Sequence, residues 1–263
     1  MSTGNPTIDH LTQVLDNVRS RRPLVHNITN YVVMQYSANA LLAVGAAPVM
    51  AHAVEEVEEL AGVAGALVLN IGTLSDHWIE GMFLAGKAAG AAGVPVVLDP
   101  VGAGATRFRT ETAGRLLRDL APAVLRGNAS EILALAGGDF HARGVDSQHS
   151  VSQAREAALA LARAHRTTVV VTGPEDYLTD GRRAGRVGNG HPLMERITGS
   201  GCALSALTGA CRAVEPDSFM AGLAALVIFG IAGELAAQEA MRPGTFQNAL
   251  LDALDSIEPQ HLR

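Results

Sequence analysis

The stretch Ala66-Leu67-Val68-Leu69-Asn70-Ile71-Gly72 decides the fold of this chain, because it is a short apolar run that ends in a polar residue and a glycine. The stretch Val94-Pro95-Val96-Val97-Leu98-Asp99-Pro100 repeats the pattern. Residues 123–125 then lead to Arg126-Gly127-Asn128, and residues 168–171 lead to Thr172-Gly173. Continuous runs rich in β-branched residues are typical of strands that are buried on both faces of a parallel sheet. The sequence therefore predicts a strand at each of these places.

Segments with helical periodicity alternate with these strands and follow them. We expect helices over residues 110–120, 130–136, 151–164, 202–212 and 219–241. Alternation of strands and helices over this length predicts an α/β layered fold with a mostly parallel sheet. No repeat, linker or change of composition divides the chain, so we predict a single domain over residues 1–263.

The composition is unusually apolar. Hydrophobic residues make up 48% of the chain, and charged residues make up 17%, below the roughly 25% that is usual for globular domains. This excludes a disordered chain, a collagen and a disulfide scaffold. The longest strongly apolar run, residues 219–233, falls short of the roughly 20 residues that span a bilayer. We therefore predict that the chain has no membrane partner.

The remaining bulk features favour a cytoplasmic protein that does not bind nucleic acid. The first ten residues show no basic segment followed by an apolar one, so no secretory signal is predicted. Cys202 and Cys211 have neither a Cys-x-x-Cys motif nor the spacing of a metal site. The formal net charge of −6 argues against nucleic acid as a partner. The basic cluster of Arg182, Arg183 and Arg186 is interpreted as a solvated loop.

Polar residues follow each of the four predicted strands. Because ligands of such sheets collect beyond the carboxyl ends of the strands, we expect Asn70, Asp99, Asn128 and Thr172 along one rim. Asp99 is a candidate for holding Mg²⁺ through water. The alternative is that these residues only end strands and cap helices. Asn128 and Glu131 resemble a capping box, and the pattern leaves open whether Glu131 is purely structural or linked to a metal.

The sharpest local motif is Ile197-Thr198-Gly199-Ser200-Gly201-Cys202, which precedes an apolar helical pattern. Backbone N–H groups of residues 199–202 at a helix N-terminus would form an anion site, because the helix dipole adds partial positive charge there. Gly199 and Gly201, like Gly102 and Gly104 after Asp99, are expected to let the backbone approach a phosphate. The dipole is expected to favour the thiolate of the cysteine. The alternative is a plain glycine-rich helix entry with a small buried cysteine.

Two further segments bear on function. Gly81-Met82-Phe83-Leu84-Ala85-Gly86-Lys87-Ala88 nearly matches a P-loop, but it lacks the final Ser or Thr and lies inside an apolar helical pattern. We therefore exclude a P-loop. Residues 23–54 place amides among apolar residues. If buried, Asn27, Asn30 and Asn39 each need a partner in the fold or on a polar heterocycle. Met50 by itself is typical of core filler.

Taken in order, these segments resemble the hydroxyethylthiazole kinases, a family of the ribokinase-like superfamily. The resemblance runs from Leu24 to Arg212 and is expected to cover the whole chain. The segments that carry it are His26-Asn27-Ile28-Thr29-Asn30, residues 38–46, residues 70–74, Leu98-Asp99-Pro100-Val101-Gly102-Ala103, Arg126-Gly127-Asn128-Ala129-Ser130-Glu131 and Thr198-Gly199-Ser200-Gly201-Cys202. The most specific feature is Gly-x-Gly-Cys at residues 199–202, where the wider superfamily has Gly-x-Gly-Asp.

The resemblance implies a ribokinase-like three-layer fold, with a mostly parallel central sheet covered by helices on both faces. It also implies Mg²⁺- and ATP-dependent phosphorylation of the primary hydroxyl of 4-methyl-5-(2-hydroxyethyl)thiazole, in thiamine biosynthesis or salvage, by a homotrimer with sites between subunits. The implied site residues form three groups: Met50, Gly199 and Asn27 for the substrate, Arg126 and Thr172 for ATP, and Asp99 and Glu131 for the metal. Cys202 takes the catalytic position. Because a thiol of ordinary pKa, near 8.5, is mostly protonated at pH 7, we expect Cys202 to orient the hydroxyl more than to deprotonate it.

Three positions depart from the family pattern, and two of them, Gln35 and Ala47, lie near the substrate segment and bear on thiazole preference. Ser200 stands where the family usually has Thr, Gln35 where it often has Asn, and Ala47 where it often has Ser. The alternatives are a hydroxymethylpyrimidine kinase, an ADP-dependent NAD(P)H-hydrate dehydratase and a non-catalytic nucleotide sensor. Cys rather than Asp at position 202 disfavours the first. The intact anion loop and Asp99 disfavour the third.

Overall fold

The computed structural model describes residues 6–137 and 147–262, so residues 1–5 of the stretch tested for a secretory signal lie outside the described residues. The strands are β1 (Leu24–Ile28), β2 (Ala47–Val49), β3 (Ala66–Asn70), β4 (Val96–Asp99), β5 (Val124–Asn128), β6 (Thr168–Thr172), β7 (Asp176–Thr179) and β8 (Ala184–Val187). The α-helices are α1 (Pro6–Arg21), α2 (Met34–Val44), α3 (Val57–Val63), α4 (Asp76–Ala92), α5 (Arg107–Leu120), α6 (Ala129–Ala136), α7 (Ser147–His165), α8 (Ser200–Val214), α9 (Ser218–Glu239) and α10 (Pro243–Ser256). Two short 3₁₀ helices are η2 (Pro192–Arg196) and η3 (Pro259–Leu262).

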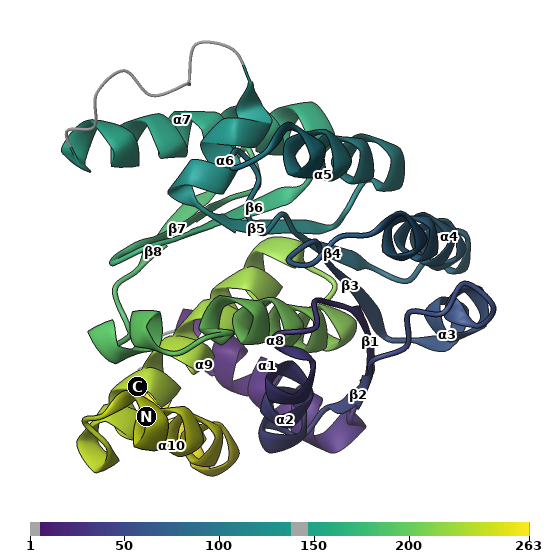
Figure 1. The fold of residues 1–263 in the computed structure, drawn as a ribbon. Helices are drawn as coiled ribbons and strands as arrows, with labels where there is room; N and C mark the ends of the chain where they lie inside the picture. The colour runs from purple at the N-terminus through teal and green to yellow at the C-terminus, as the bar shows by residue number, and fades with distance from the viewer. Residues whose placement is uncertain (1–5, 138–146, 263) are drawn as a thin grey trace.

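The strands form one eight-stranded sheet in the order β2-β1-β3-β4-β5-β6-β7-β8. The strands from β2 to β6 pair in parallel, and β7 and β8 continue the sheet as an antiparallel hairpin. Helices cover both faces (Figure 1): α3 to α7 lie on one face, and α1, α2, α8 and α9 lie on the other. The predicted three-layer α/β fold is therefore confirmed.

Alternation of side chains along each central strand fills both layers. In β3, Val68 packs into the cluster that contains α8 and α9, while Leu67 and Leu69 pack into the cluster that contains α4 and α5. Because successive side chains point to opposite faces, a continuous apolar run supplies both cores at once. This is the physical reason why runs without alternation predicted buried parallel strands.

The four predicted strands are present as β3, β4, β5 and β6, and the five predicted helices are present as α5 to α9. The strands β1, β2, β7 and β8 and the helices α1, α2, α3 and α10 were not predicted. The helix α1 has its apolar residues Leu11, Val14, Leu15 and Val18 at helical spacing, a pattern from which it could have been found. The hairpin of β7 and β8 has short strands of mixed polarity, which give little signal. The near P-loop lies within α4, as expected.

The argument that excluded a membrane span by length is wrong for α9. This helix has 22 residues and is apolar enough to cross a bilayer by length and composition. Its apolar 18-residue window is instead 72% buried within the structure, and the helix packs against the sheet, α8 and α10. A helix that is apolar all round is expected in a protein core as well as in a membrane.

The basic cluster is only partly a loop. Arg186 lies in β8, and Arg183 forms ion pairs with Asp180 at 2.7 Å and Asp217 at 2.7 Å. Asp217 also caps α9 by accepting hydrogen bonds from the first amides of that helix. Arg183 therefore joins the hairpin to the start of α9.

Candidate functional site

The candidate site lies where the carboxyl ends of β3 to β6 meet the N-terminus of α8. Four residues of this region each lie two positions after a valine that packs on the α8 face of the sheet: Asn70, Asp99, Arg126 and Thr172. Since side chains alternate between faces with a period of two, all four are directed to that face. The register also aligns Asn70 with Asp99, and Asn128 with Thr172. The predicted rim is thus present.

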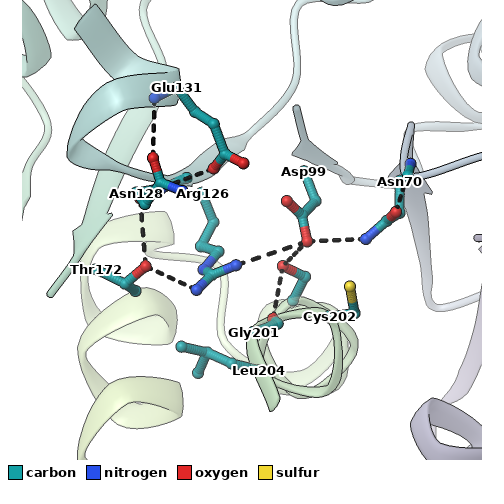
Figure 2. Close-up of polar contacts among 12 residues, drawn as sticks. Asn70, Asp99, Arg126, Asn128, Glu131, Thr172, Gly201, Cys202 and Leu204 are labelled. Carbon is teal, nitrogen blue, oxygen red and sulfur yellow. Dashed lines mark hydrogen bonds and ion pairs between the residues drawn. The ribbon is translucent and has the colours of Figure 1, made fainter. Parts of the chain in front are cut away.

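Asp99 is the buried centre of this rim. Its side chain is 0% exposed, and Oδ2 accepts hydrogen bonds from Asn70 Nδ2 at 2.9 Å and Ser205 Oγ at 2.7 Å (Figure 2). Burial raises its pKa to about 6, against the opposing effect of Arg126 nearby, and the charge of Glu131 raises it further. Among the described residues, Oδ1 has no hydrogen-bond partner. A buried carboxylate oxygen without a donor is costly, so it marks a place where a ligand would add an interaction.

Arg126 lies between Asp99 and Thr172 (Figure 2). Its Nη2 donates to Thr172 Oγ1 at 2.7 Å, and its Nη1 lies 3.7 Å from Asp99 Oδ2. The side chain is nearly buried, at 11% exposed. β5 extends to Asn128, so Arg126 belongs to the strand itself rather than to the loop after it. A nearly buried guanidinium at this rim supplies positive charge for an anionic ligand.

The N-terminus of α8 brings backbone amides to the same place. Gly199 is the N-cap with φ +91°, no side chain caps the helix, and the first intrahelical hydrogen bond runs from Ala203 N to Gly199 O. The amides of residues 199–202 therefore precede the helix's own hydrogen bonds, as an anion site requires.

Two of the glycines also have a packing role that the sequence did not indicate. A Cβ on Gly201 would lie 2.7 Å from Arg126 Nη1, and one on Gly102 would lie 3.1 Å from Arg109 Cδ. These two glycines therefore make room for arginine side chains. Gly199 is constrained both by its positive φ and by Val33, whose Cγ1 would lie 2.8 Å from a Cβ.

Cys202 lies in the first turn of α8 and is half-buried. Its Sγ accepts a hydrogen bond from Asn30 Nδ2 at 3.5 Å. Its pKa is raised to about 11, mainly by burial and then by the negative charge of Asp99. The expectation that the helix dipole favours the thiolate is thus wrong, because burial and the neighbouring carboxylate outweigh the dipole. The thiol is protonated at neutral pH.

Glu131 has a structural role that the sequence left open. The predicted capping box is present, since Asn128 Oδ1 accepts from Glu131 N and Glu131 Oε2 accepts from Asn128 N. Glu131 Oε1 also accepts from Gly102 N at 2.8 Å, which ties the loop after β4 to α6. Each oxygen keeps a further lone pair, so the carboxylate can still accept from a metal-bound water.

Two of the predicted substrate residues lie at the other side of the site, Asn27 in β1 and Met50 directly after β2. Asn27 is 0% exposed, and its Nδ2 donates to Val25 O, while Oδ1 has no partner among the described residues. Met50 directly follows β2 and is half-buried. The next residue, Ala51, is held to β1 because its carbonyl accepts from His26 Nε2 at 2.8 Å. Among the described residues, no hydrogen bond joins Asn27 or Met50 to Cys202.

Three residues of the site, Ser205, Arg109 and Asp176, were not singled out from the sequence, whereas Asn30 was expected only to need a partner if buried. Asn30 connects Cys202 to Asn70, because its Nδ2 donates to Cys202 Sγ and to Asn70 Oδ1, the latter at 2.9 Å. Ser205 Oγ donates a hydrogen bond to Asp99 Oδ2. Arg109 donates to the carbonyls of Ile71, Gly72 and Val101, which joins the loops after β3 and β4. Asp176 lies close enough to Arg126 for their charges to interact. Asn30 stood in a quoted motif, but nothing in the pattern indicated which atoms it would contact.

Comparison with known proteins assigns the family. A family model described as "Hydroxyethylthiazole kinase family" matches residues 15–260. Hydroxyethylthiazole kinase of Desulfotalea psychrophila is 52% identical over 94% of this chain and 91% of its own. The corresponding protein of Oleidesulfovibrio alaskensis is 55% identical over 93% of this chain and 92% of its own. This chain belongs to the hydroxyethylthiazole kinase family.

Solved structures agree with the family and with its fold. The hydroxyethylthiazole kinase of Pyrococcus horikoshii OT3 superposes with a TM-score of 0.90, at 48% identity, over 97% of this chain and 96% of its own. A Bacillus subtilis pyridoxal kinase in complex with ADP superposes with a TM-score of 0.59 at 19% identity, over 80% of this chain and 91% of its own. At that identity the second likeness shows the fold alone. The ribokinase-like fold is therefore confirmed.

Members of a kinase family need a divalent cation with ATP, and the residues present fit Mg²⁺. The described residues hold no cluster of three or more His, Cys, Asp or Glu that could bind a metal ion. Mg²⁺ in phosphoryl-transfer sites commonly takes only one or two carboxylates and completes its shell with phosphates and water. The free Oδ1 of Asp99, with Glu131 close enough to influence its pKa, meets that requirement.

Proposed function

We propose that this chain transfers the γ-phosphoryl group of ATP to the primary hydroxyl of 4-methyl-5-(2-hydroxyethyl)thiazole. The observation that supports it best is the convergence of three features at one rim: the nearly buried Arg126, the partnerless Oδ1 of Asp99 and the uncapped N-terminus of α8. Phosphoryl transfer needs positioning and neutralisation of charge rather than covalent chemistry, and these groups supply both. The substrate class follows from relatives that are about half identical over nearly the whole chain.

On this proposal Arg126 and Thr172 hold the phosphates of ATP. Their mutual hydrogen bond at 2.7 Å fixes the guanidinium before ATP arrives, so less conformational freedom is lost on binding. The amides of Gly199, Ser200, Gly201 and Cys202 form the anion hole for the group in transfer.

Asp99 and Glu131 would hold Mg²⁺, which when bound supplies positive charge to the phosphate oxygens. The Oδ1 of Asp99, which has no partner among the described residues, supports ligation by this residue, directly or through water. Glu131 would act through water, because both of its oxygens already accept from backbone amides.

Cys202 is proposed to orient the substrate hydroxyl. Its thiol is buried beside Asp99, and the charge of that carboxylate opposes ionisation. A protonated thiol donates or accepts only weak hydrogen bonds, which suits positioning rather than proton abstraction. If Cys202→Ala abolished turnover with unchanged thiazole affinity while Cys202→Asp restored it, a base role would be established instead.

Met50, Asn27 and Gly199 are proposed to bind the thiazole, and the subunits are proposed to form a homotrimer with the site between them. Large apolar side chains beside the substrate segment support an interface there, because Tyr31 and Val32 are each 66% exposed. Light scattering on the purified protein measures the assembly, and a monomer at all concentrations would contradict it. Two free cysteines and a requirement for ATP fit a cytoplasmic location, which we also propose.

The deciding experiment measures coupled ADP release from Mg·ATP, with hydroxyethylthiazole and separately with hydroxymethylpyrimidine. We expect release that depends on the thiazole and is far slower with the pyrimidine. A folded protein that releases no ADP with the thiazole would overturn the proposal. Faster release with the pyrimidine would favour the related kinase activity.

A further inference from the structure

The carboxylate of Asp99 is held asymmetrically. Oδ2 accepts from Ser205 Oγ at 2.7 Å and from Asn70 Nδ2 at 2.9 Å, and Arg126 Nη1 lies 3.7 Å away. Oδ1 receives no hydrogen bond from the described residues, although the whole side chain is buried. Figure 2 shows the dashed contacts of Asp99 gathered on one oxygen, with the other left clear. Both donors therefore act on the same oxygen.

Without these donors the carboxylate would have an alternative partner close by. Rotation of an Asp carboxylate about its last bond is soft, so hydrogen bonds rather than a rotamer fix its orientation. A guanidinium pairs most strongly with a carboxylate through two parallel hydrogen bonds, and Arg126 already lies at 3.7 Å. Rotation of Asp99 into that pairing would engage both oxygens and would remove Arg126 from the phosphates. Ser205 and Asn70 oppose this collapse.

Ser205 approaches Asp99 from the same helix that carries the anion loop. It is 0% exposed and lies one turn after Gly201, whose carbonyl is 3.3 Å from Oγ. A hydroxyl has one proton to donate, and the shorter contact, to Asp99, takes it. The hydroxyl therefore sets the carboxylate relative to the amides of α8. Asn70 is fixed in turn, because its Oδ1 accepts from Gly72 N at 3.0 Å and Asn30 Nδ2 at 2.9 Å.

We propose that Ser205 is a positioning residue of this kinase, which holds Asp99 Oδ1 open for the cation and keeps the carboxylate off Arg126. The proposal rests on the proposed function, since it takes Asp99 as the residue that holds Mg²⁺. It goes beyond that function because it assigns a role to a side chain that would contact neither ATP nor the thiazole. In this role Ser205 keeps the Asp99 carboxylate available to the cation and the Arg126 guanidinium available to phosphate.

The test compares Ser205→Ala with a matched control in the same helix. Thr208→Val removes a hydroxyl that is also buried, at 1% exposed, but whose one hydrogen bond within the described part of the chain is to Leu204 O in α8, at 2.8 Å. Calorimetry of ADP binding, with Mg²⁺ and then with EDTA, measures how much the cation strengthens binding, and it needs no turnover. Steady-state kinetics at varied Mg²⁺ give a second readout.

We expect Ser205→Ala to reduce the Mg²⁺-dependent gain in ADP affinity by about tenfold, the size typical of losing one hydrogen bond to a charged group. The Mg²⁺ concentration for half-maximal activity should rise by a similar factor. ADP affinity in EDTA should also fall, because Asp99 turns to Arg126. Ser205→Thr keeps the hydroxyl and should restore the gain in part, and Thr208→Val should leave it unchanged.

Two results would overturn the proposal. One is a Ser205→Ala protein with the wild-type response to Mg²⁺, and the other is an equal loss in Thr208→Val, which would indicate a purely structural effect. If Ser205→Ala does not fold, Ser205→Cys, which keeps the volume and weakens the donor, takes its place in the same measurements. Failure of the wild type to phosphorylate the thiazole would overturn the proposed function, while the ADP measurements would still decide the role of Ser205.

Discussion

The substitution Gly201→Ala tests whether this glycine is required by Arg126. The added Cβ would lie 2.7 Å from Nη1, 2.9 Å from Nη2 and 3.2 Å from Cζ of Arg126. Ordinary van der Waals contact begins at 3.4 Å, so the guanidinium has to move back by several tenths of an ångström. It cannot do so freely, because Nη2 is bonded to Thr172 at 2.7 Å and the side chain is nearly buried.

The size of the effect follows from the cost of overpacking. Inserting one methyl group into a well-packed site costs about 1–3 kcal/mol. Displaced from its place at the rim, Arg126 would lose a comparable part of its interaction with the phosphates. We therefore expect the KM for ATP to rise by about tenfold or more, since about 1.4 kcal/mol corresponds to a factor of ten. The KM for the thiazole should change much less.

The assay is coupled ADP release at varied ATP, with ADP binding by calorimetry and the melting temperature measured alongside. Gly62→Ala in α3 and Gly90→Ala in α4 are matched controls, because a Cβ at either place meets nothing within 4 Å. They should leave the KM for ATP unchanged and raise stability by up to about 1 kcal/mol through helix propensity. A KM for ATP within twofold of wild type in Gly201→Ala would refute the reasoning.

Three further predictions concern the rim. Asp176, whose pKa is raised to about 6 mainly by burial, binds a proton more readily in the folded than in the unfolded chain, so the free energy of unfolding should fall as pH rises from about 4 to 6. Asp176→Asn should flatten that slope in urea titrations, and an unchanged slope would contradict it. Glu131→Gln leaves one acceptor oxygen for the backbone amides of Gly102 and Asn128, which bind separate oxygens of Glu131, so the free energy of unfolding should fall by about 1 kcal/mol. Ser130→Ala, which leaves both hydrogen bonds in place, is the control. Arg109→Lys cannot reach all three carbonyls that Arg109 binds, so it should lower the melting temperature by several degrees and reduce kcat, whereas Arg107→Lys, which replaces an exposed arginine, should change neither.

The sequence by itself determined the central strands and the edge of the sheet at which the site forms. The runs that became β3 and β4 are apolar at every position until Asn70 and Asp99, because successive positions of these doubly covered strands add side chains alternately to the two cores. The glycine-rich motif also predicted the N-terminus of α8, because small residues leave the first backbone amides of a helix accessible to an anion.

Only the tertiary structure decided which atoms meet at that rim. Ser205 and Asp99 are 106 positions apart, and their contact depends on how α8 packs across the sheet. The thiol of Cys202 shows the same limit: a local argument from the helix dipole favoured the thiolate, whereas burial and Asp99 raise its pKa. The sequence motif likewise predicted only that Gly201 lets the backbone approach a phosphate, and the tertiary structure shows that Arg126 also packs against this glycine. Local pattern fixes where the backbone ends and turns, but burial, charge and close packing depend on neighbours that are distant in sequence.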